Sequence, residues 1–360
     1  MPADRIQVSA PGRLCLFGEH QDFLGLPVIA IAVTRDITFA GVRRSDGMFV
    51  LDLPDISARE EYDPREELPY RNKRDYLPSA INVLRRDGYP LDPGYDITVR
   101  GNIPINAGCG SSSAMLNAWI GFLKAAHGGS HDVDPTAVAR DAHRAEVIEF
   151  DEPGGMMDHY SSALGGLLHI KTEGDIECTP LAAKLDGFVL GDSLTPKNTT
   201  GTLAASRAAM ADAVEIAGGL LPGFDIHETH LDEARPVLDQ LQPRGREMLE
   251  GNLINRDICR EALVELNKER PDPALFGDLL TRHHEQLSRH IQVSTEKLDQ
   301  MVQASLDAGA LGAKMNGSGG GGCMFAYAPG RQDEVVEAIR GVGARAWPVA
   351  PHPGLQVKIG

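Results

Sequence analysis

The chain has 360 residues, 42% hydrophobic and 24% charged, and its 35 basic and 51 acidic residues give a net charge of −16 with histidine neutral. This length predicts about two domains, the composition excludes wholesale disorder, and the charge argues against nucleic-acid or anionic-membrane binding. The five cysteines are scattered without a C-x-x-C pair, no apolar signal segment opens the chain, and the longest apolar run spans only residues 28–33, so we predict a soluble, cytoplasmic protein without a disulfide framework or a cysteine zinc site.

The N-terminal half is predicted to be α+β. Runs rich in Val, Ile and Thr, together with alternating stretches, predict strands at residues 5–10, 28–33, 37–43, 94–100, 165–171 and 188–191. Helical spacing, a glycine loop followed by small apolar residues, and an Asp-Pro start predict helices at residues 76–84, 111–126 and 135–150.

From about residue 200 the chain reads as mostly helical. We predict helices at residues 200–217, 229–251, 255–269, 273–291, 294–308 and 332–340, and short strands at 313–315, 323–327 and 346–349. The predicted organisation is an N-terminal domain of residues 1–190 and a C-terminal domain of residues 191–360, the latter with helices on a small sheet.

A cluster of polar residues follows the first predicted strand. Residues 10–25 read Ala-Pro-Gly-Arg-Leu-Cys-Leu-Phe-Gly-Glu-His-Gln-Asp-Phe-Leu-Gly and bring Arg13, Glu19, His20 and Asp22 close together. Each residue alone would be an ordinary charge on a surface turn. As a group they offer several acceptors and a switchable donor, which is what a polyhydroxylated ligand requires, since each buried hydroxyl needs a partner.

Two further segments are rich in glycine. Residues 107–114 read Ala-Gly-Cys-Gly-Ser-Ser-Ser-Ala and lead into a predicted helix. Glycines and a helix start are suited to wrapping an anion, although a plain helix cap is an equally good interpretation of this segment alone. Residues 312–323 hold six glycines, five of them within 317–322. We expect the backbone there to approach a ligand closely, with a flexible hairpin as the alternative.

Together these three segments resemble the galactokinase branch of the GHMP kinase superfamily, named for galactokinase, homoserine kinase, mevalonate kinase and phosphomevalonate kinase. A fourth segment agrees with this resemblance, because Glu146 stands twelve residues before Asp158 in Gly-Gly-Met-Met-Asp-His-Tyr. The similarity extends from residue 8 to about residue 328. The motifs are specific jointly and in this order, whereas each alone would be weak to moderate.

The resemblance implies a two-domain GHMP kinase fold, with an N-terminal domain like domain 2 of ribosomal protein S5 and a ferredoxin-like C-terminal domain. It implies transfer of the ATP γ-phosphoryl group to a sugar hydroxyl, the anomeric one in galactokinases. Asp158 would be the catalytic aspartate and Arg13 its partner. A helix cap is the structural alternative for Asp158.

The remaining roles follow from the same resemblance. It implies sugar binding by Glu19, His20, Asp22, Gly155 and Asp158. It implies Mg²⁺ binding by Ser112 and Glu146. It implies ATP binding by Gly108, Cys109, Gly110, Ser111, Ser112, Ser113, Ala114, Gly317 and Gly319. The implied partner is a small-molecule sugar, and we expect neither nucleic acid nor a membrane as a partner and a monomer or small homo-oligomer.

The first segment departs from the galactokinase pattern. Galactokinases usually continue Asp-Tyr-Asn-x-Gly, whereas this chain reads Asp22-Phe-Leu-Gly25, so a hydroxyl and an amide are missing. These departures leave the catalytic residues intact but alter the recognition of sugar hydroxyls. Galactose stays the leading acceptor, with arabinose, a hexuronic acid or another aldose behind it. The alternatives are a mevalonate-type kinase, which normally lacks the Glu-His-x-Asp run, and a non-catalytic sugar- and ATP-sensing protein, which tends to lose the serine loop kept here.

Overall fold

The computed structural model describes residues 3–105, 107–152, 154–195 and 199–360, with residues 199–205 described by their backbone alone. A mixed sheet runs through the N-terminal half in the order β12 (Gln356–Ile359), β1 (Arg5–Phe17), β2 (Val28–Arg43), β5 (Tyr95–Gly101), β3 (Phe49–Leu53), β4 (Ala58–Tyr62). The N-terminal end of β2, residues 28–31, pairs with β6 (Leu167–Lys171), which pairs in turn with β7 (Glu177–Pro180). The predicted strands 28–33 and 37–43 are thus one continuous strand.

The first strand is longer than predicted and carries Arg13, one of the predicted site residues. We predicted a strand over residues 5–10, but β1 continues through Pro11 and Gly12 to Phe17. Its register with β2 shifts between Pro11 and Gly12 and again between Cys15 and Phe17. Such irregularities redirect side chains and are common beside active sites, and Arg13 lies between these two.

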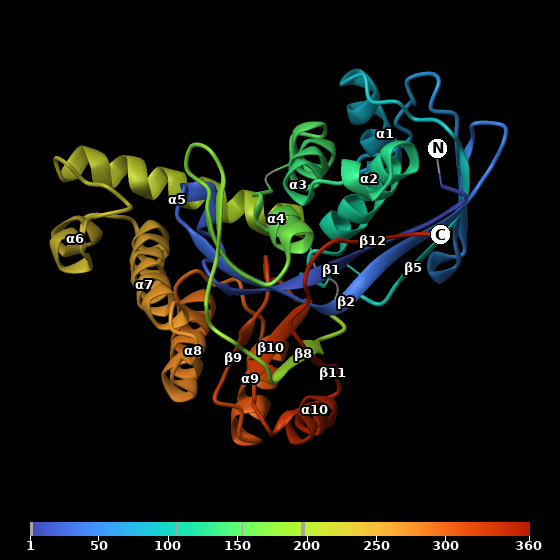
Figure 1. Cartoon of the computed structure of the whole chain (residues 1–360). Helices are drawn as coiled ribbons and strands as arrows, with labels where there is room; N and C mark the ends of the chain where they lie inside the picture. The colour runs from blue at the N-terminus through green and yellow to red at the C-terminus, as the bar shows by residue number, and fades with distance from the viewer. Residues whose placement is uncertain (1–2, 106, 153, 196–198) are drawn as a thin grey trace.

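Helices α1 (Tyr76–Arg86), α2 (Ser111–Gly128), α3 (Pro135–His143) and α4 (Met157–Leu164) lie together on one side of this sheet (Figure 1). Trp119 of α2 packs between Phe39 and Phe49 of the sheet, with ring centroids 5.3 and 5.5 Å away. The predicted helix from residue 135 ends earlier than expected as a regular helix and continues as a π-helical turn, η4 (Arg144–Ile148).

A second, antiparallel sheet has the order β11 (Arg345–Val349), β8 (Phe188–Asp192), β10 (Cys323–Tyr327), β9 (Gly312–Met315). Residues from both sheets share a core in which Phe17, Phe188, Phe276 and Phe325 are fully buried. The predicted boundary between residues 190 and 191 falls inside β8. The last strand, β12, returns to pair with β1, so the two chain ends lie near each other (Figure 1).

The remaining helices are α5 (Thr199–Leu220), α6 (Leu231–Leu238), α7 (Pro243–Leu266), α8 (Pro273–Arg289), α9 (Glu296–Asp307) and α10 (Gln332–Gly341). The predicted break between the helices 229–251 and 255–269 is wrong, because α7 runs through it without interruption. The break lies before Pro243, which occupies the first turn of α7, where its missing N–H needs no intrahelical partner. Strands β3 and β4 were not predicted. No helix in the described part of the chain combines the length and apolarity that a bilayer crossing requires.

Candidate active site

The centre of the site is an ion pair between a strand and a helix. Arg13 of β1 donates from Nε to Asp158 Oδ1 over 2.8 Å and from Nη2 to Asp158 Oδ2 over 2.9 Å. Burial works to lower the pKa of Arg13, but the charge and hydrogen bonds of Asp158, together with the nearby Cys15 and Cys109, outweigh it and the pKa is raised. The Arg13 side chain is 4% exposed and that of Asp158 27%, so the carboxylate remains accessible from the cavity while the arginine holds it by a two-bond fork.

The glycine- and serine-rich segment of residues 107–114, here called the phosphate loop, lies directly against this pair. Arg13 donates from Nη1 to the carbonyl of Gly108, and its backbone N–H donates to Cys109 O over 3.0 Å. Gly110 has a φ of +70°, and a Cβ there would lie 3.4 Å from Asp158 Oδ2, so glycine suits both the left-handed backbone and the close approach. Helix α2 begins at Ser111, immediately after Gly110, which leaves its first N–H groups available to an anion.

Glu146 stands on the π-helical turn η4, next to the serines of α2. Its Oε1 accepts from Ser112 Oγ, and its Oε2 accepts from Ser113 Oγ at 2.7 Å and from His159 Nε2 at 2.8 Å. Burial works to raise the pKa of Glu146, but the hydrogen bonds from His159 and the two serines outweigh it and the pKa is lowered. The structure thus brings an ionised carboxylate and a hydroxyl together, both hard oxygen ligands of the kind that Mg²⁺ prefers.

Asp22 also lines the cavity, in the short 3₁₀ turn η1 (Asp22–Leu24). Its Oδ1 accepts from the Phe23 N–H at 3.0 Å. Burial, followed by repulsion from Asp158, raises the pKa of Asp22 to about 6. Gly155 faces this carboxylate so closely that a Cβ would lie 1.7 Å from Asp22 Oδ2. The predicted substrate residues Asp22, Gly155 and Asp158 therefore lie together.

The Glu19 side chain is paired with protein groups and is not free to bind a sugar by both of its oxygens. The Glu19 carboxylate is buried, and Lys314 of β9 donates to its Oε1 as well as to the carbonyls of Cys15 and Met315 at 3.0 Å. His283 Nδ1 lies 3.8 Å from Glu19 Oε2, and this oxygen accepts no hydrogen bond from the described residues. Because Oε2 is itself buried, the Glu19 carboxylate serves first as the partner of Lys314.

His20 has a φ of +60°, and its Nε2 hydrogen-bonds to the carbonyl of Ser318 over 3.0 Å. Because a carbonyl only accepts, His20 Nε2 is the donor in this bond. The bond ties the first segment to the third, glycine-rich segment. His20 therefore lies at the cavity wall with one ring nitrogen committed to the protein.

Most of the predicted site residues line a single cavity, and a few lie behind it. Those that line it are Arg13, Glu19, His20, Asp22, Gly108, Gly110, Ser111, Ser112, Ser113, Glu146, Gly155, Asp158 and Gly317. The predicted ATP-binding residues Cys109, Ala114 and Gly319 are not among the described lining residues. Cys109 and Ala114 are buried, and a Cβ at Gly319 would lie 2.1 Å from Val293 O.

The glycine-rich third segment approaches protein backbone rather than open space. A Cβ at Gly317 would lie 2.7 Å from the carbonyl of Gly108, and one at Gly322 would lie 2.6 Å from the carbonyl of Ala107. Both glycines have positive φ. We expected these glycines to admit a ligand, whereas these two let the third segment pack directly onto the phosphate loop, and Gly317 also lines the cavity.

Sequence reasoning missed three residues at the cavity end beyond Glu146. Arg74 donates to Glu152 from Nε over 2.8 Å and from Nη2 over 3.0 Å, and the Tyr76 hydroxyl donates to the same carboxylate over 2.9 Å. All three line the cavity. No local pattern distinguishes them, since they stand in a polar stretch and at a helix start. Lys314 and Asn316, in contrast, carried a signal in the sequence, because a lysine and an asparagine stand between the glycines of the third segment.

Descriptions of known families match three parts of this chain. Residues 2–43 match a galactokinase galactose-binding signature, residues 75–166 match the GHMP kinases N terminal domain, and residues 260–345 match GHMP kinases C terminal. The segments that carried the sequence resemblance fall within or beside these ranges. The predicted family resemblance and fold are therefore confirmed.

Similar whole proteins include kinases of two names. A mevalonate kinase of Thermococcus sibiricus is 29% identical over 94% of this chain and 94% of its own, and a galactokinase of Mycobacterium bovis is 29% identical over 93% and 92%. The Lactococcus lactis galactokinase complexed with galactose superposes with a TM-score of 0.81 at 20% identity, covering 98% of this chain and 95% of its own. The Methanococcus jannaschii mevalonate kinase gives 0.74 at 19% identity, covering 96% and 98%. These superpositions show a shared fold.

Proposed function

The chain belongs to the GHMP kinase family, and on that premise we propose that it is an ATP-dependent sugar kinase. It transfers the γ-phosphoryl group to a sugar hydroxyl, the anomeric hydroxyl of galactose or a related aldose. The observation that carries the proposal is the Arg13–Asp158 fork, which contacts the phosphate loop and shares its cavity with Asp22. An acceptor hydroxyl bound near Asp22 would have a carboxylate beside it and a phosphate-binding loop beyond.

Each member of this centre has a defined task. Asp158 accepts the proton of the acceptor hydroxyl as its oxygen bonds to phosphorus and the bond to the departing ADP oxygen breaks. Arg13 orients Asp158 through the two-bond fork and places positive charge next to Gly108 in the phosphate loop. Phosphoryl transfer depends mainly on positioning and charge stabilisation, so the precise orientation of the carboxylate matters more than its strength as a base.

The cavity is acidic, which bears on how an anionic nucleotide binds. Its described lining includes five carboxylates, Glu19, Asp22, Glu146, Glu152 and Asp158, against the two guanidinium groups of Arg13 and Arg74. A triphosphate needs further positive charge there. We propose that Ser112 and Glu146 would hold Mg²⁺, which would supply the positive charge that the triphosphate needs.

The acceptor end favours a neutral polyol. Asp22 and Asp158 both face it, Glu19 is already paired with Lys314, and the lining guanidinium groups of Arg13 and Arg74 are bound to carboxylates. A carboxylate acceptor such as mevalonate would be repelled by Asp22, whereas sugar hydroxyls can donate to it. Mevalonate remains the second candidate because a mevalonate kinase and a galactokinase are equally similar in sequence at 29%.

The direct test is a coupled ADP-release assay with Mg²⁺, ATP and a panel of acceptors that includes galactose, other aldoses, uronic acids and mevalonate. The proposal predicts turnover with a neutral aldose and product phosphorylated at the sugar. Turnover with mevalonate alone would replace the sugar assignment by the second candidate. Absence of ADP release with every acceptor, together with measurable ATP binding, would favour a sensing protein instead.

A further inference from the structure

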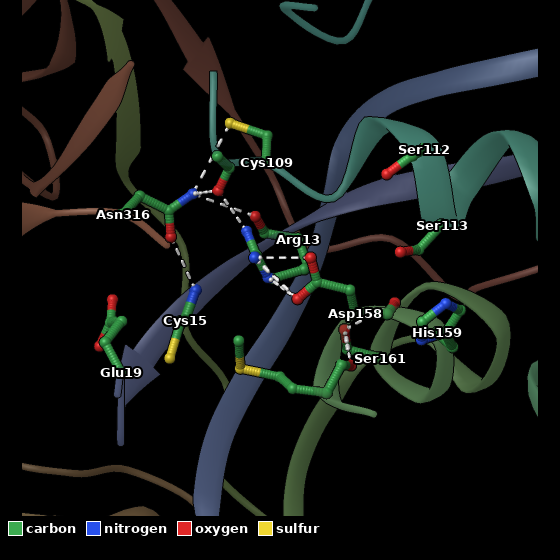
Figure 2. Close-up of polar contacts among 12 residues, drawn as sticks. Arg13, Cys15, Glu19, Cys109, Ser112, Ser113, Asp158, His159, Ser161 and Asn316 are labelled. Atoms are coloured by element: carbon green, nitrogen blue, oxygen red, sulfur yellow. Dashed lines mark hydrogen bonds and ion pairs between the residues drawn. The ribbon is translucent and has the colours of Figure 1, made fainter. Parts of the chain in front are cut away.

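The side chain of Asn316 joins three segments that converge on the reaction centre. It follows β9, is fully buried, and lies at the start of the glycine-rich loop. Its Oδ1 accepts from the Cys15 N–H at 2.9 Å, and its Nδ2 donates to Arg13 O at 3.3 Å, to Gly108 O at 2.9 Å and to Cys109 Sγ at 3.6 Å (Figure 2). One carboxamide thus contacts β1 on both sides of Leu14 and the phosphate loop.

The bonds to β1 resemble those of a neighbouring strand. On its other edge, Arg13 and Cys15 pair with Ala32 and Ala30 of β2. On the edge facing Asn316, the Arg13 C=O and the Cys15 N–H are two residues apart and point the same way, as alternate residues of a strand do. A side-chain amide offers one acceptor and two donors, so Asn316 closes this edge where β12 no longer pairs with β1.

The bond to Gly108 acts on the phosphate loop. The Gly108 carbonyl accepts from Arg13 Nη1 and from Asn316 Nδ2, which uses both of its lone pairs. Fixing this carbonyl also fixes the orientation of the rigid peptide unit that it shares with the Cys109 N–H. The loop that would hold phosphate is therefore locked to the same side chain that holds the backbone of Arg13.

We propose that Asn316 is a positioning residue for phosphoryl transfer. It fixes the position of the Arg13 guanidinium relative to the phosphate loop, because it links β1 of the first sheet to that loop from the end of β9 in the second. It acts through Arg13 and Gly108 and touches no reacting atom. The inference rests on the proposed kinase function, and it assigns to the third segment a task that the glycines alone do not perform.

The first test replaces Asn316 by Asp and by Leu. Asn316→Asp keeps the acceptor for Cys15 but loses the bonds that the amide donates, and Asn316→Leu removes all of these side-chain bonds without adding charge. Because small displacements of a reacting arrangement are costly, we expect kcat to fall about 10- to 100-fold with the acceptor KM changed less than about threefold. Unchanged kcat in both folded variants would overturn the proposal.

Asn82→Asp provides a matched control. Asn82 of α1 is also buried and also pairs by its amide with a backbone N–H and C=O, those of Leu68, at 2.8 and 2.9 Å. It does not belong to the described cavity lining. We expect Asn82→Asp to lower the unfolding temperature much as Asn316→Asp does, but to leave kcat unchanged. An equal loss of kcat in both would mean that Asn316 contributes only to stability.

A second test separates positioning through Arg13 from general damage. In an Arg13→Gln background, Asn316→Leu should lower kcat by less than about threefold, since residues that act as one unit are not additive. A full additive loss would overturn the proposed route through Arg13.

Nucleotide affinity tests the inference independently of the acceptor. Calorimetric titration with the β,γ-imido analogue of ATP and Mg²⁺ should show Kd raised about 3- to 10-fold in Asn316→Leu and unchanged in Asn82→Asp, as expected when a loop carbonyl loses one of its two anchors. If the wild-type protein phosphorylates no acceptor, the proposed function fails, and this comparison still decides whether Asn316 orders the phosphate loop. Equal affinity in wild type and Asn316→Leu would refute that ordering.

Discussion

At the phosphate end of the cavity Glu146 receives bonds from two serines and a histidine and its pKa lies below the usual range, whereas at the substrate end Asp22 accepts a backbone N–H and burial raises its pKa to about 6. Glu146 is buried beside the serine loop, and Asp22 is half-buried near Asp158. The difference lies in the number of donors that the protein itself supplies.

This difference indicates what each end awaits. A carboxylate that the protein already stabilises in its ionised form can bind a cation without first losing a proton, and its donors hold it in place. A buried carboxylate with a raised pKa gains most from a ligand that donates hydrogen bonds, because the donors offset its lost hydration. We therefore associate the Glu146 end with the metal-bound nucleotide and the Asp22 end with a polyhydroxylated acceptor.

Removing the metal should have the largest effect. If Ser112 and Glu146 hold Mg²⁺ at the phosphate end, excess EDTA should abolish ADP release, because the acidic cavity then has too little positive charge for a triphosphate. Re-addition of Mg²⁺ should restore the rate in the same coupled assay. Full activity in EDTA would remove the proposed contrast between the two ends.

Asp158→Asn should have the next largest effect, since Asp158 lies where the two ends meet. We expect turnover to fall by about 10²-fold or more, the range of a general-base contribution. Acceptor and nucleotide affinities, measured by calorimetry, should change little, because Asn preserves the size of the side chain. Near wild-type turnover would show that Asp158 is not catalytic.

Asp22→Ala should act on the substrate end alone. Losing a buried partner for hydroxyl groups costs about 1–3 kcal/mol, which corresponds to a rise in the acceptor KM of roughly 10- to 100-fold. The ATP KM should stay within about twofold in initial-rate measurements, since the substitution leaves the phosphate end intact. A rise in the ATP KM alone would reverse the assignment of the two ends.

A pH series should give the smallest effect and test the raised pKa of Asp22. As pH falls through about 6, Asp22 takes up a proton and loses its capacity to accept bonds at that oxygen, so the acceptor KM should rise about tenfold between pH 7 and pH 5. In Asp22→Asn this rise should disappear, which separates Asp22 from Asp158 and other titrating groups. A profile that is the same in both proteins would place the titration elsewhere.

Some of this site could be predicted from local sequence. Gly110 followed by three serines predicts a tight turn and a helix start, and α2 does begin at Ser111. The resemblance to GHMP kinases supplied the pairing of Arg13 with Asp158, which the structure contains. The break before Pro243 was also readable in principle, because proline favours the first turn of a helix, yet apolar spacing alone led us to place it wrongly.

Other features had no local signal. Glu19 reads as a free ligand in the sequence, and its pairing with Lys314 follows only from the contact of β9 with the end of β1. The glycines of the third segment indicate close approach without saying to what, and the structure shows that Gly317 and Gly322 meet the phosphate loop. Arg74 and Tyr76 reach the cavity because α1 packs beside η4.

The sequence by itself therefore determined the backbone turns, the helix starts and, through joint motifs, the family, because glycine, proline and serine act on their immediate neighbours. The tertiary structure decided which charges are paired and which carboxylate awaits a ligand. Arg13 and Asn316 are 303 residues apart in the chain, and the energy of such a contact depends on burial and on the exact set of donors around each acceptor. Those quantities exist only once the two sheets have packed together.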